Sequence, residues 1–202
     1  MESLADLQTP IFWAEGHPGK LDRNSWELQI IGACLEPQTF TWAQLMLLHS
    51  TTVDGRLTSV TRWSVRGLWE GVSLKTLLEK VKAKPSVKYV RFWSHGLVYD
   101  TSIPLAIALK EKSLVAWKFN GHFLSEDYGG PMRAFIPYLW GYKSAKSIVK
   151  IELLEHYIPG FWEKRGYTDS AEIEPGFCRD MNEGGAIKQI PGGEVLKFKD
   201  ED

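Results

Sequence analysis

Three short segments bring cations, glycines and small hydroxyls together in places where a purely structural core would not need them. The first, LTSVTRWS, spans residues 57–64 and combines a serine with an arginine. In the second, YGGPMR (128–133), two glycines let backbone amides approach a ligand beside the fork-shaped cation of Arg133. In the third, GYKSAKS (141–147), lysine ammoniums, a hydroxyl and main-chain amides can converge on a phosphate. The three segments together indicate an anion-binding pocket.

Two of these segments also have a plainer interpretation. GYKSAKS on its own is typical of a solvated strand entrance, where lysines simply face water. A Gly-Gly-Pro run before an arginine occurs more often in turns than around ligands. The anion-binding interpretation therefore depends on the segments occurring together.

The overall charge does not explain an anion site, so such a site must be local. The formal net charge of the 202 residues is −1, which directs the molecule neither to nucleic acid nor to an anionic membrane. Hydrophobic residues make up 44% and charged residues 24%, as in an ordinary globular protein. The 9 tryptophans suit either a thick core or flat walls around a planar ligand, and core packing is the default.

The sequence contains no motif for several other common kinds of functional site and no sign of a targeting or membrane segment. The two cysteines are too few for a disulfide framework or an all-thiolate zinc site, and the five histidines are dispersed without an i, i+4 pair. No Gly-x-Ser-x-Gly elbow or Walker loop occurs. The first ten residues, MESLADLQTP, contain two acids and no apolar run, and no stretch approaches the ~20 apolar residues of a membrane helix. We therefore expect a soluble, cytoplasmic protein without membrane insertion.

The elements that must position the three segments are short strands and shorter helices. Apolar alternation and turn residues predict the strands, although Asp54-Gly55 can instead form a tight hairpin turn within the second of them. Apolar periodicity predicts the helices, of which the first begins with a capping box from Thr41 and Gln44. Strands are expected over 26–32, 51–60, 87–94, 97–103, 114–119 and 147–155, and helices over 41–49, 73–84 and 104–112.

This order of elements predicts an α+β (mixed α/β) domain with mixed β-sheets and short surrounding helices. Strands arrive singly or in pairs, so regular βαβ winding is not favoured. We expect one domain over residues 1–174. Residues 175–202 are poor in large apolar groups and rich in glycine and charge, which indicates an extended C-terminal arm over the domain or a loose tail.

Seven segments in a fixed order resemble the sulfite-oxidase-like, molybdopterin-binding oxidoreductases. The resemblance extends from about Trp26 to about Tyr167 and is closest to the short, single-domain prokaryotic members. Each segment alone is a weak signal, but seven in register are specific. The segments are VTRWS (60–64), WEGVSLKTLL (69–78), SIPL (102–105), LVAWKFNGHFL (114–124), YGGPMRAFIP (128–137), YKSAK (142–146) and PGFWEKRGY (159–167).

The resemblance implies a sulfite-oxidase-type fold whose crevice holds molybdopterin and its molybdenum. Ser94 matches a small hydroxyl that contacts the cofactor in this family, and Tyr128 stands where the family has His or Asn. The segment FWAEGHPG (12–19) resembles the family's pterin-contacting entry loosely, which adds His17 to the candidates. The cofactor phosphate is expected at Arg133, Ser144, Ala145 and Lys146.

The resemblance also marks the candidate metal ligand, and here the sequence departs from the family. A His-Cys pair precedes VTRWS in the family, and that cysteine binds the molybdenum. This chain has Thr58 and Ser59 in those places. Cys34 and Cys178 lie too far from position 59 in the sequence to correspond to the family's cysteine ligand. Molybdenum held by two dithiolene sulfurs suits a soft thiolate. A serine oxygen is harder and deprotonates far less readily than cysteine, whose reference pKa is about 8.5.

Three explanations of Ser59 stay open at this point. Ser59 binds the metal as an alkoxide, with its pKa lowered by the ion, and the redox chemistry is altered. Alternatively, the domain holds the cofactor, or only its phosphate, without oxygen-atom transfer. The third explanation is that the cysteine was replaced deliberately to prepare a stable or inactive form.

The residues that follow Ser59 supply the remaining candidates for the pocket. Arg62 lies three residues from the metal position and can hold an oxyanion or a metal-oxo group, although a strand-end salt bridge is the plainer interpretation. For Trp63 we expect core packing, because large aromatic side chains are usually buried. His95, Trp93 and Tyr128 are further candidates for the pocket wall.

The sequence therefore predicts a molybdopterin-dependent oxidoreductase that transfers an oxygen atom at a Mo-oxo centre. The expected substrate is a small oxyanion or a sulfoxide-type acceptor. Because no haem or flavin motif is present, electrons are expected to pass through a separate partner. The alternative is a non-catalytic molybdopterin- or anion-binding domain that has lost the metal ligand.

Overall fold

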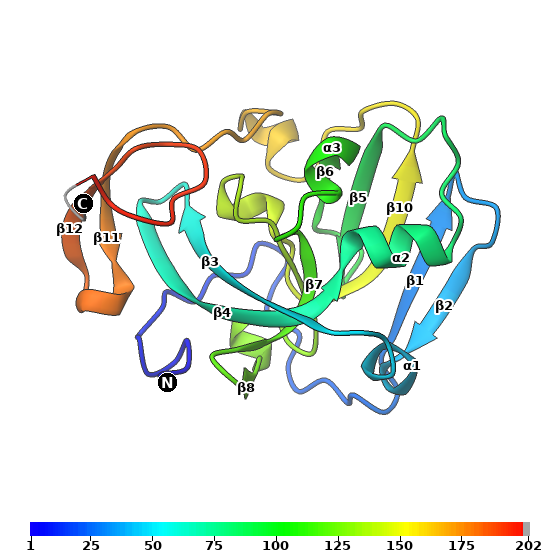
Figure 1. Ribbon diagram of the computed structural model, residues 1–202, viewed down its shortest axis with the longest axis horizontal. Coiled ribbons are helices and arrows are strands. Elements are labelled where there is room, and N and C mark those ends of the chain that lie inside the picture. Colours follow the sequence, from blue (N-terminus) through cyan, green and yellow to red (C-terminus); the bar gives the residue numbers. More distant parts are fainter. Residues whose placement is uncertain (200–202) are drawn as a thin grey trace.

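Two mixed β-sheets share a large hydrophobic core in the computed structural model, which describes residues 1–199 (Figure 1). In the five-stranded sheet only the pair of β1 and β10 is parallel. Its strands run in the order β2 (Gln38–Thr41), β1 (Glu27–Gly32), β10 (Ile148–Leu154), β5 (Tyr89–Ser94) and β6 (Asp100–Pro104).

The second sheet has seven strands and is built around the long strand β4 (Trp63–Ser73). On one path the order is β12 (Ala186–Ile190), β11 (Gly176–Asp180), β4, β7 (Leu114–Phe119) and β8 (His122–Phe123). In addition, β3 (Thr51–Ser59) pairs with β4, and β9 (Arg133–Phe135) pairs with β7. The mixed sheets and few short helices confirm the predicted fold class.

The three α-helices begin where their caps predict but end early. In α1 (Trp42–Met46), Thr41 and Gln44 form the expected capping box. In α2 (Leu74–Lys80), the hydroxyl of Ser73 accepts the backbone N–H of Thr76, and the apolar stripe of the helix is buried. The last helix, α3 (Leu105–Ala108), has only one turn. The predicted ranges of 41–49, 73–84 and 104–112 were therefore too long.

The strand predictions are confirmed at β1, β5, β6, β7 and β10. At Asp54-Gly55, where the sequence allowed either a strand or a tight hairpin turn, the structure has the strand β3. Strand β3 runs through these two residues without a turn and pairs with β4 from Thr51 to Ser59. Gly55 packs under an aromatic ring, where a Cβ atom would lie 2.8 Å from the ring of Phe135. A glycine inside a strand here marks close packing, not a bend.

The C-terminal segment forms part of the larger sheet, which differs from the expected arm or loose tail. Strands β11 and β12 form an antiparallel hairpin, and β11 pairs in parallel with β4. Ile190, Val195 and Phe198 are buried, so a few apolar residues at the right positions join the core. The charge of buried Asp180 faces Arg56, at 3.2 Å. The last three residues of the predicted arm, 200–202, lie outside the described part of the chain.

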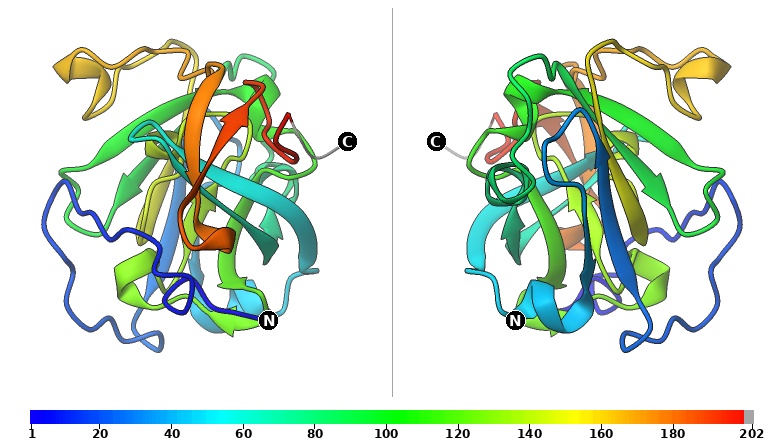
Figure 2. Two further views of the ribbon diagram at one scale, coloured as in Figure 1. Left: turned by 90° about the vertical axis from the view of Figure 1, so that its left-hand side faces the viewer. Right: turned by 90° about the vertical axis from the view of Figure 1, so that its right-hand side faces the viewer.

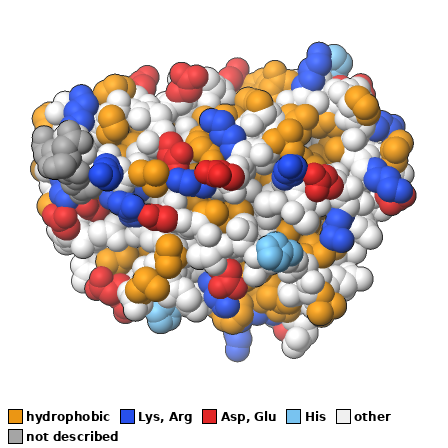
Figure 3. Space-filling view, viewed as in Figure 1, with side chains coloured by type: hydrophobic (Ala, Val, Ile, Leu, Met, Phe, Trp, Pro, Cys, Tyr) orange, Lys and Arg blue, Asp and Glu red, His pale blue; other side chains and the backbone are white. Residues whose placement is uncertain are grey.

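Segments far apart in sequence meet on one side of the molecule. Figure 2 shows the hairpin of β11 and β12, in orange and red, and the N-terminal segment, in blue, on the side that is at the left in Figure 1. Figure 3 shows cationic and anionic side chains interspersed over the face drawn there. No helix within residues 1–199 has the length and apolar character needed to cross a membrane.

Candidate functional site

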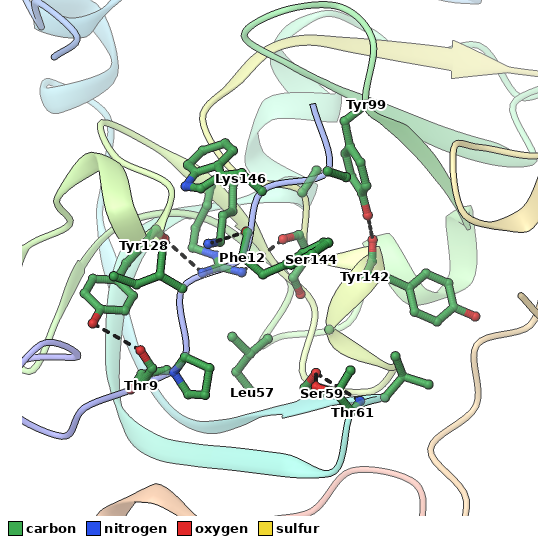
Figure 4. Close-up of a pocket in the computed structure, with 18 of the residues that line it drawn as sticks. Thr9, Phe12, Leu57, Ser59, Thr61, Tyr99, Tyr128, Tyr142, Ser144 and Lys146 are labelled. Carbon is green, nitrogen blue, oxygen red and sulfur yellow. Dashed lines mark hydrogen bonds between the residues drawn. The ribbon is translucent and has the colours of Figure 1, made fainter. Parts of the chain in front are cut away.

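A pocket of about 580 Å³ opens where the N-terminal segment crosses the ends of the two sheets (Figure 4). This volume is typical of small-molecule and cofactor sites. Its walls come from residues 9–15, the β3–β4 turn, the end of β5, the 3₁₀ helix η2 (Gly141–Lys143) with the turn that follows it, the aromatic pair Trp162 and Tyr167, and β11.

Seven of the nine predicted site residues line this one pocket. They come from β3, β5, β9, the 3₁₀ helix η1 (Glu126–Tyr128) and the turn after η2, so the fold brings together positions up to 87 residues apart in sequence. The seven are Ser59, Ser94, Tyr128, Arg133, Ser144, Ala145 and Lys146. Their roles towards a ligand stay predictions, and Arg62 and His17 are not among the lining residues.

Arg133 supplies a buried cation at the inner end of the pocket. Its guanidinium donates to the carbonyl oxygens of Tyr128, at 2.9 Å, and Ser144, at 3.0 Å. Burial lowers the pKa of Arg133 to about 10. Because a guanidinium has five N–H donors, some remain available for a ligand.

Lys146 lies beside Arg133 and has the more perturbed charge. Its ammonium donates to the carbonyl oxygens of Phe12, at 3.1 Å, and Asp127, at 2.8 Å. Burial, together with the nearby Arg133, lowers the pKa of Lys146 to about 7. Two adjacent cations that are desolvated and held by carbonyl groups create a strong preference for an anion.

The turn that contains these groups is fixed by its own side chains. The Ser144 hydroxyl accepts the backbone N–H of Ile136 at 3.0 Å, and the Ser94 hydroxyl donates to the carbonyl of Lys146 at 2.7 Å. Just before the turn, Lys143 is fully buried and forms an ion pair with Glu163. These bonds hold residues 144–146 in place before any ligand arrives.

The N-terminal segment closes one side of the pocket. The Tyr128 hydroxyl donates to the carbonyl of Thr9 at 3.2 Å, and burial raises its pKa. At the other end of the segment, the buried Glu15 carboxylate accepts the backbone N–H groups of Val98 and Tyr99 and lies 3.0 Å from Nδ1 of His95. Glu15 is the one carboxylate among the lining residues.

Ser59 lies away from the cations, with Leu57 and Ser144 between it and Lys146 in Figure 4. Its hydroxyl oxygen is 2.8 Å from Oγ1 of Thr61 and accepts the backbone N–H of Thr61 at 3.2 Å. The pocket therefore has a cationic end and a hydroxyl end.

Arg62, predicted to hold an oxyanion, points elsewhere. It has a left-handed backbone conformation, with φ of 62°, at the β3–β4 turn. Its guanidinium donates to the carbonyls of Glu174 and Pro175, both at 3.3 Å, and lies over the ring of Trp140. The turn directs the side chain towards the segment before β11, away from the pocket.

Of the other residues predicted to lie at the pocket, some line it and some lie outside it. His17 pairs with Asp127 at 3.1 Å outside the pocket and packs edge-on against Trp13. Of the wall candidates, Tyr128 lines the pocket, whereas His95 and Trp93 do not.

Several residues that line the pocket were not predicted from the sequence, and the residue type of Trp63 pointed to the core instead. Trp63, expected in the core, is half-buried and lines the pocket. Trp162 and Tyr167 are stacked with centroids 4.9 Å apart, and their closeness in PGFWEKRGY was the one hint. Arg179 lies in a segment expected to be an arm, so composition alone concealed it.

The pocket combines the adjacent cations Arg133 and Lys146 with aromatic walls, an arrangement that suits an anionic ligand with an aromatic or apolar part. The sequence matches the family described as "Oxidoreductase molybdopterin binding domain" over residues 14–162. The chain belongs to this family of sulfite-oxidase-like, molybdopterin-binding oxidoreductases, and the indicated cofactor is molybdopterin with molybdenum.

Curated relatives and a solved structure agree with this assignment. The chain is 30% identical to the uncharacterized oxidoreductase YuiH of Bacillus subtilis, over 78% of this chain and 80% of YuiH. It is 31% identical to a putative protein-methionine-sulfoxide reductase subunit, YedZ1, of Azospira oryzae, over 78% of this chain and 60% of that protein. The catalytic subunit MsrP of protein-methionine-sulfoxide reductase from Ralstonia nicotianae is 26% identical over 82% of this chain, which spans 53% of MsrP.

The structural comparison concerns the fold alone. The sulfane dehydrogenase SoxCD of Paracoccus pantotrophus superposes with a TM-score of 0.67 at 18% identity, over 86% of this chain and 46% of that chain. The predicted sulfite-oxidase-type fold is thereby confirmed.

The residues present fit the phosphate of such a cofactor and depart from the family at the metal. Arg133 and Lys146 give the anion site that a phosphate requires. Both cysteines, Cys34 and Cys178, are buried away from the pocket, and burial raises the pKa of each thiol. Within residues 1–199 no cluster of three or more His, Cys, Asp or Glu side chains is arranged to hold a metal.

Proposed function

We propose that this protein is a molybdopterin-dependent oxidoreductase that removes an oxygen atom from a small oxyanion or a sulfoxide-type substrate. The observation that carries this proposal is the polarity of the pocket. Arg133 and Lys146 form a cationic end suited to the cofactor phosphate, and Ser59 lies at the other end, where the family has its metal ligand. A cofactor that carries both a phosphate and a metal would suit the two ends of the pocket.

The bound cofactor supplies two-electron oxygen-atom transfer chemistry at its molybdenum. Arg133 and Lys146 would hold its phosphate by charge-assisted hydrogen bonds. The turn of residues 144–146, fixed by the Ser94 and Ser144 hydroxyls, keeps these donors in place without a cost at the moment of binding. The N-terminal segment excludes water from one side of the crevice.

Ser59 is proposed as the protein ligand of the metal. The backbone N–H of Thr61 donates to the Ser59 oxygen, and the Thr61 hydroxyl is within hydrogen-bond distance of it. Hydrogen bonds to a charged oxygen favour its ionised form, so these donors would support an alkoxide. The Thr61 contacts thus compensate in part for the poorer acidity of serine.

The proposed net reaction converts a sulfoxide, two electrons and two protons to a thioether and water. The electrons would come from a separate electron-transfer protein. The names of two relatives support this arrangement, since YedZ1 is called a reductase subunit and MsrP a catalytic subunit. A cytoplasmic location remains part of the proposal and can be tested by cell fractionation.

A non-catalytic cofactor-binding domain is the second candidate, and one observation favours it. No cysteine lines the pocket within the described residues 1–199. Such a domain would keep the phosphate site and lose the metal.

Metal and pterin content separate the two candidates. Protein purified from a host that makes the cofactor should contain about one molybdenum per chain, measured by inductively coupled plasma mass spectrometry. It should also release a fluorescent pterin on denaturation. Pterin without molybdenum would favour the non-catalytic domain, and the absence of both would refute the two candidates together.

A Ser59→Cys variant tests the metal ligand. A new thiolate next to molybdenum should add a visible absorption band or increase metal retention. Thr58→Cys is a matched control, because Thr58 precedes Ser59 on β3, is buried and does not line the pocket. An unchanged spectrum for metal-loaded Ser59→Cys would show that position 59 does not face the metal.

A further inference from the structure

Three side chains form a row across adjacent strands on the pocket side of the larger sheet. Ser59 on β3 pairs directly with Trp63 on β4, and Trp63 pairs with Arg179 on β11. Directly paired residues have their side chains on the same face of a sheet, about 5 Å apart. Ser59 and Arg179 are therefore separated by about 10 Å, with the Trp63 side chain between them. All three line the pocket.

The backbone of Arg179 is fixed, while its charged group is available. Its N–H donates to the carbonyl of Arg62 at 3.0 Å, and the neighbouring side chains of Cys178 and Asp180 are buried on the opposite face. Within residues 1–199 the Arg179 guanidinium has neither a hydrogen bond nor an ion pair, and the residue is exposed. It is thus a cation on a fixed backbone position of the pocket wall, and its guanidinium has no partner among the described residues.

Arg62 does not compete for this position. Its guanidinium is occupied by the carbonyls of Glu174 and Pro175 and by the ring of Trp140. The buried Arg133 and the partly buried Lys146 lie at the opposite, cationic end, and the carboxylate of Glu15 accepts the backbone N–H groups of Val98 and Tyr99. Near Ser59, Arg179 is the cation among the lining residues.

We propose that Arg179 determines substrate specificity by binding a negatively charged group of the substrate next to Ser59. This inference rests on the proposed function and names the substrate class: an oxyanion, or a sulfoxide that carries a carboxylate, in preference to a neutral sulfoxide. A guanidinium matches carboxylates and oxyanions through two parallel N–H donors. The flat side of Trp63 gives the remainder of the substrate an apolar surface.

Steady-state kinetics test the preference directly. Arg179→Gln should raise the KM for chlorate and for methionine sulfoxide blocked at its amino group by about tenfold, the loss expected for one charge-assisted hydrogen bond. The KM for neutral dimethyl sulfoxide should change less than about twofold, and Arg179→Lys should restore part of the loss. Arg23→Gln removes the same charge outside the pocket and should leave all three values unchanged.

A chemical measurement tests the site without turnover. Phenylglyoxal modifies exposed arginines, and peptide mass spectrometry reports the rate at each position. Sulfate should slow modification of Arg179 more than chloride at equal ionic strength, in protein with or without cofactor. Modification of the distant, cation–π-bound Arg23 should respond equally to both salts.

The outcomes separate this inference from the proposed function. Protein that contains no molybdenum or pterin refutes the proposed function, while sulfate protection of Arg179 would still support the anion site. If the metal is present and Arg179→Gln affects charged and neutral substrates equally, the specificity role of Arg179 is overturned. Equal protection by sulfate and chloride would overturn the anion site itself.

Discussion

The charge of Lys146 should make the stability of the cofactor-free protein depend on pH in a specific direction. Burial beside Arg133 lowers the pKa of Lys146 from 10.5 to about 7 in the folded protein, whereas the unfolded chain keeps the usual value. Between these two values the unfolded state binds one more proton than the folded state. The free energy of unfolding therefore rises with pH across this window.

The size of the effect follows from the two pKa values. One proton of difference changes the free energy of unfolding by about 1.4 kcal/mol for each pH unit. Between about pH 7 and pH 9, Lys146 should thus contribute roughly 2–3 kcal/mol. Below about pH 6 the folded and unfolded states both hold the proton, and the contribution becomes constant.

Urea denaturation of the cofactor-free protein at a series of pH values measures this slope. The comparison is between the natural protein and Lys146→Met, which has no ammonium to titrate. Lys75→Met serves as the control, because Lys75 is on the exposed side of α2 with its side chain 64% exposed. The natural protein and Lys75→Met should gain stability towards pH 9 relative to Lys146→Met. Parallel curves for all three proteins would refute the buried charge and with it the electrostatic basis of the phosphate site.

Further predictions concern the supports of the pocket. Arg133→Ala should lower the pterin content of purified protein, and full pterin retention would disprove its role at the phosphate. Lys143→Met leaves Glu163 buried and unpaired, so urea denaturation should show a loss of about 3–5 kcal/mol, and a loss below about 1 kcal/mol would contradict this. Gly160→Ala would place a Cβ atom 2.3 Å from the carbonyl oxygen of Asp100. Urea denaturation should show a free energy of unfolding lowered by about 1–3 kcal/mol, and an unchanged value would contradict this clash.

The cationic end of the pocket could be predicted because its chemistry is local in sequence. Ser144, Ala145 and Lys146 are consecutive, and Arg133 follows a glycine-rich turn, so their types alone indicated an anion site. The β3–β4 hairpin, which closes at Ser59, and the long-range pairing of Ser94 on β5 with Ile148 on β10 then add these two serines to the same pocket. Short-range patterns and one family resemblance were sufficient here.

The direction of Arg62 could not be predicted for a physical reason. A left-handed backbone is usually signalled by glycine or asparagine, and Arg62 is neither. The turn conformation instead follows from the pairing of β3 and β4 up to Ser59 and Trp63, which leaves three residues to close the connection. Which way the side chain points is decided by this closure, and residue type gives no information about it.

The hairpin of β11 and β12 was hidden for a different reason. Its stability does not come from a continuous apolar run, which composition would detect. It comes from alternate positions: Cys178 and Asp180 are buried, while Phe177 and Arg179 between and beside them are exposed. The buried charge of Asp180 also depends on Arg56, 124 residues earlier. A partner so distant leaves no local signal.

The lining residues of the pocket fall into two groups, those within the range that matches the family and those outside it. The phosphate end and Ser59 lie within residues 14–162, the range that matches the family. Other lining residues lie outside it, namely residues 9–13 before the matched range and Tyr167 and Arg179 after it. A domain built in this way can keep one cofactor while the segments before and after the matched range select the substrate. The decisive comparison is therefore between Ser59 variants, which should change the metal, and Arg179 variants, which should change substrate preference while metal and pterin content stay constant.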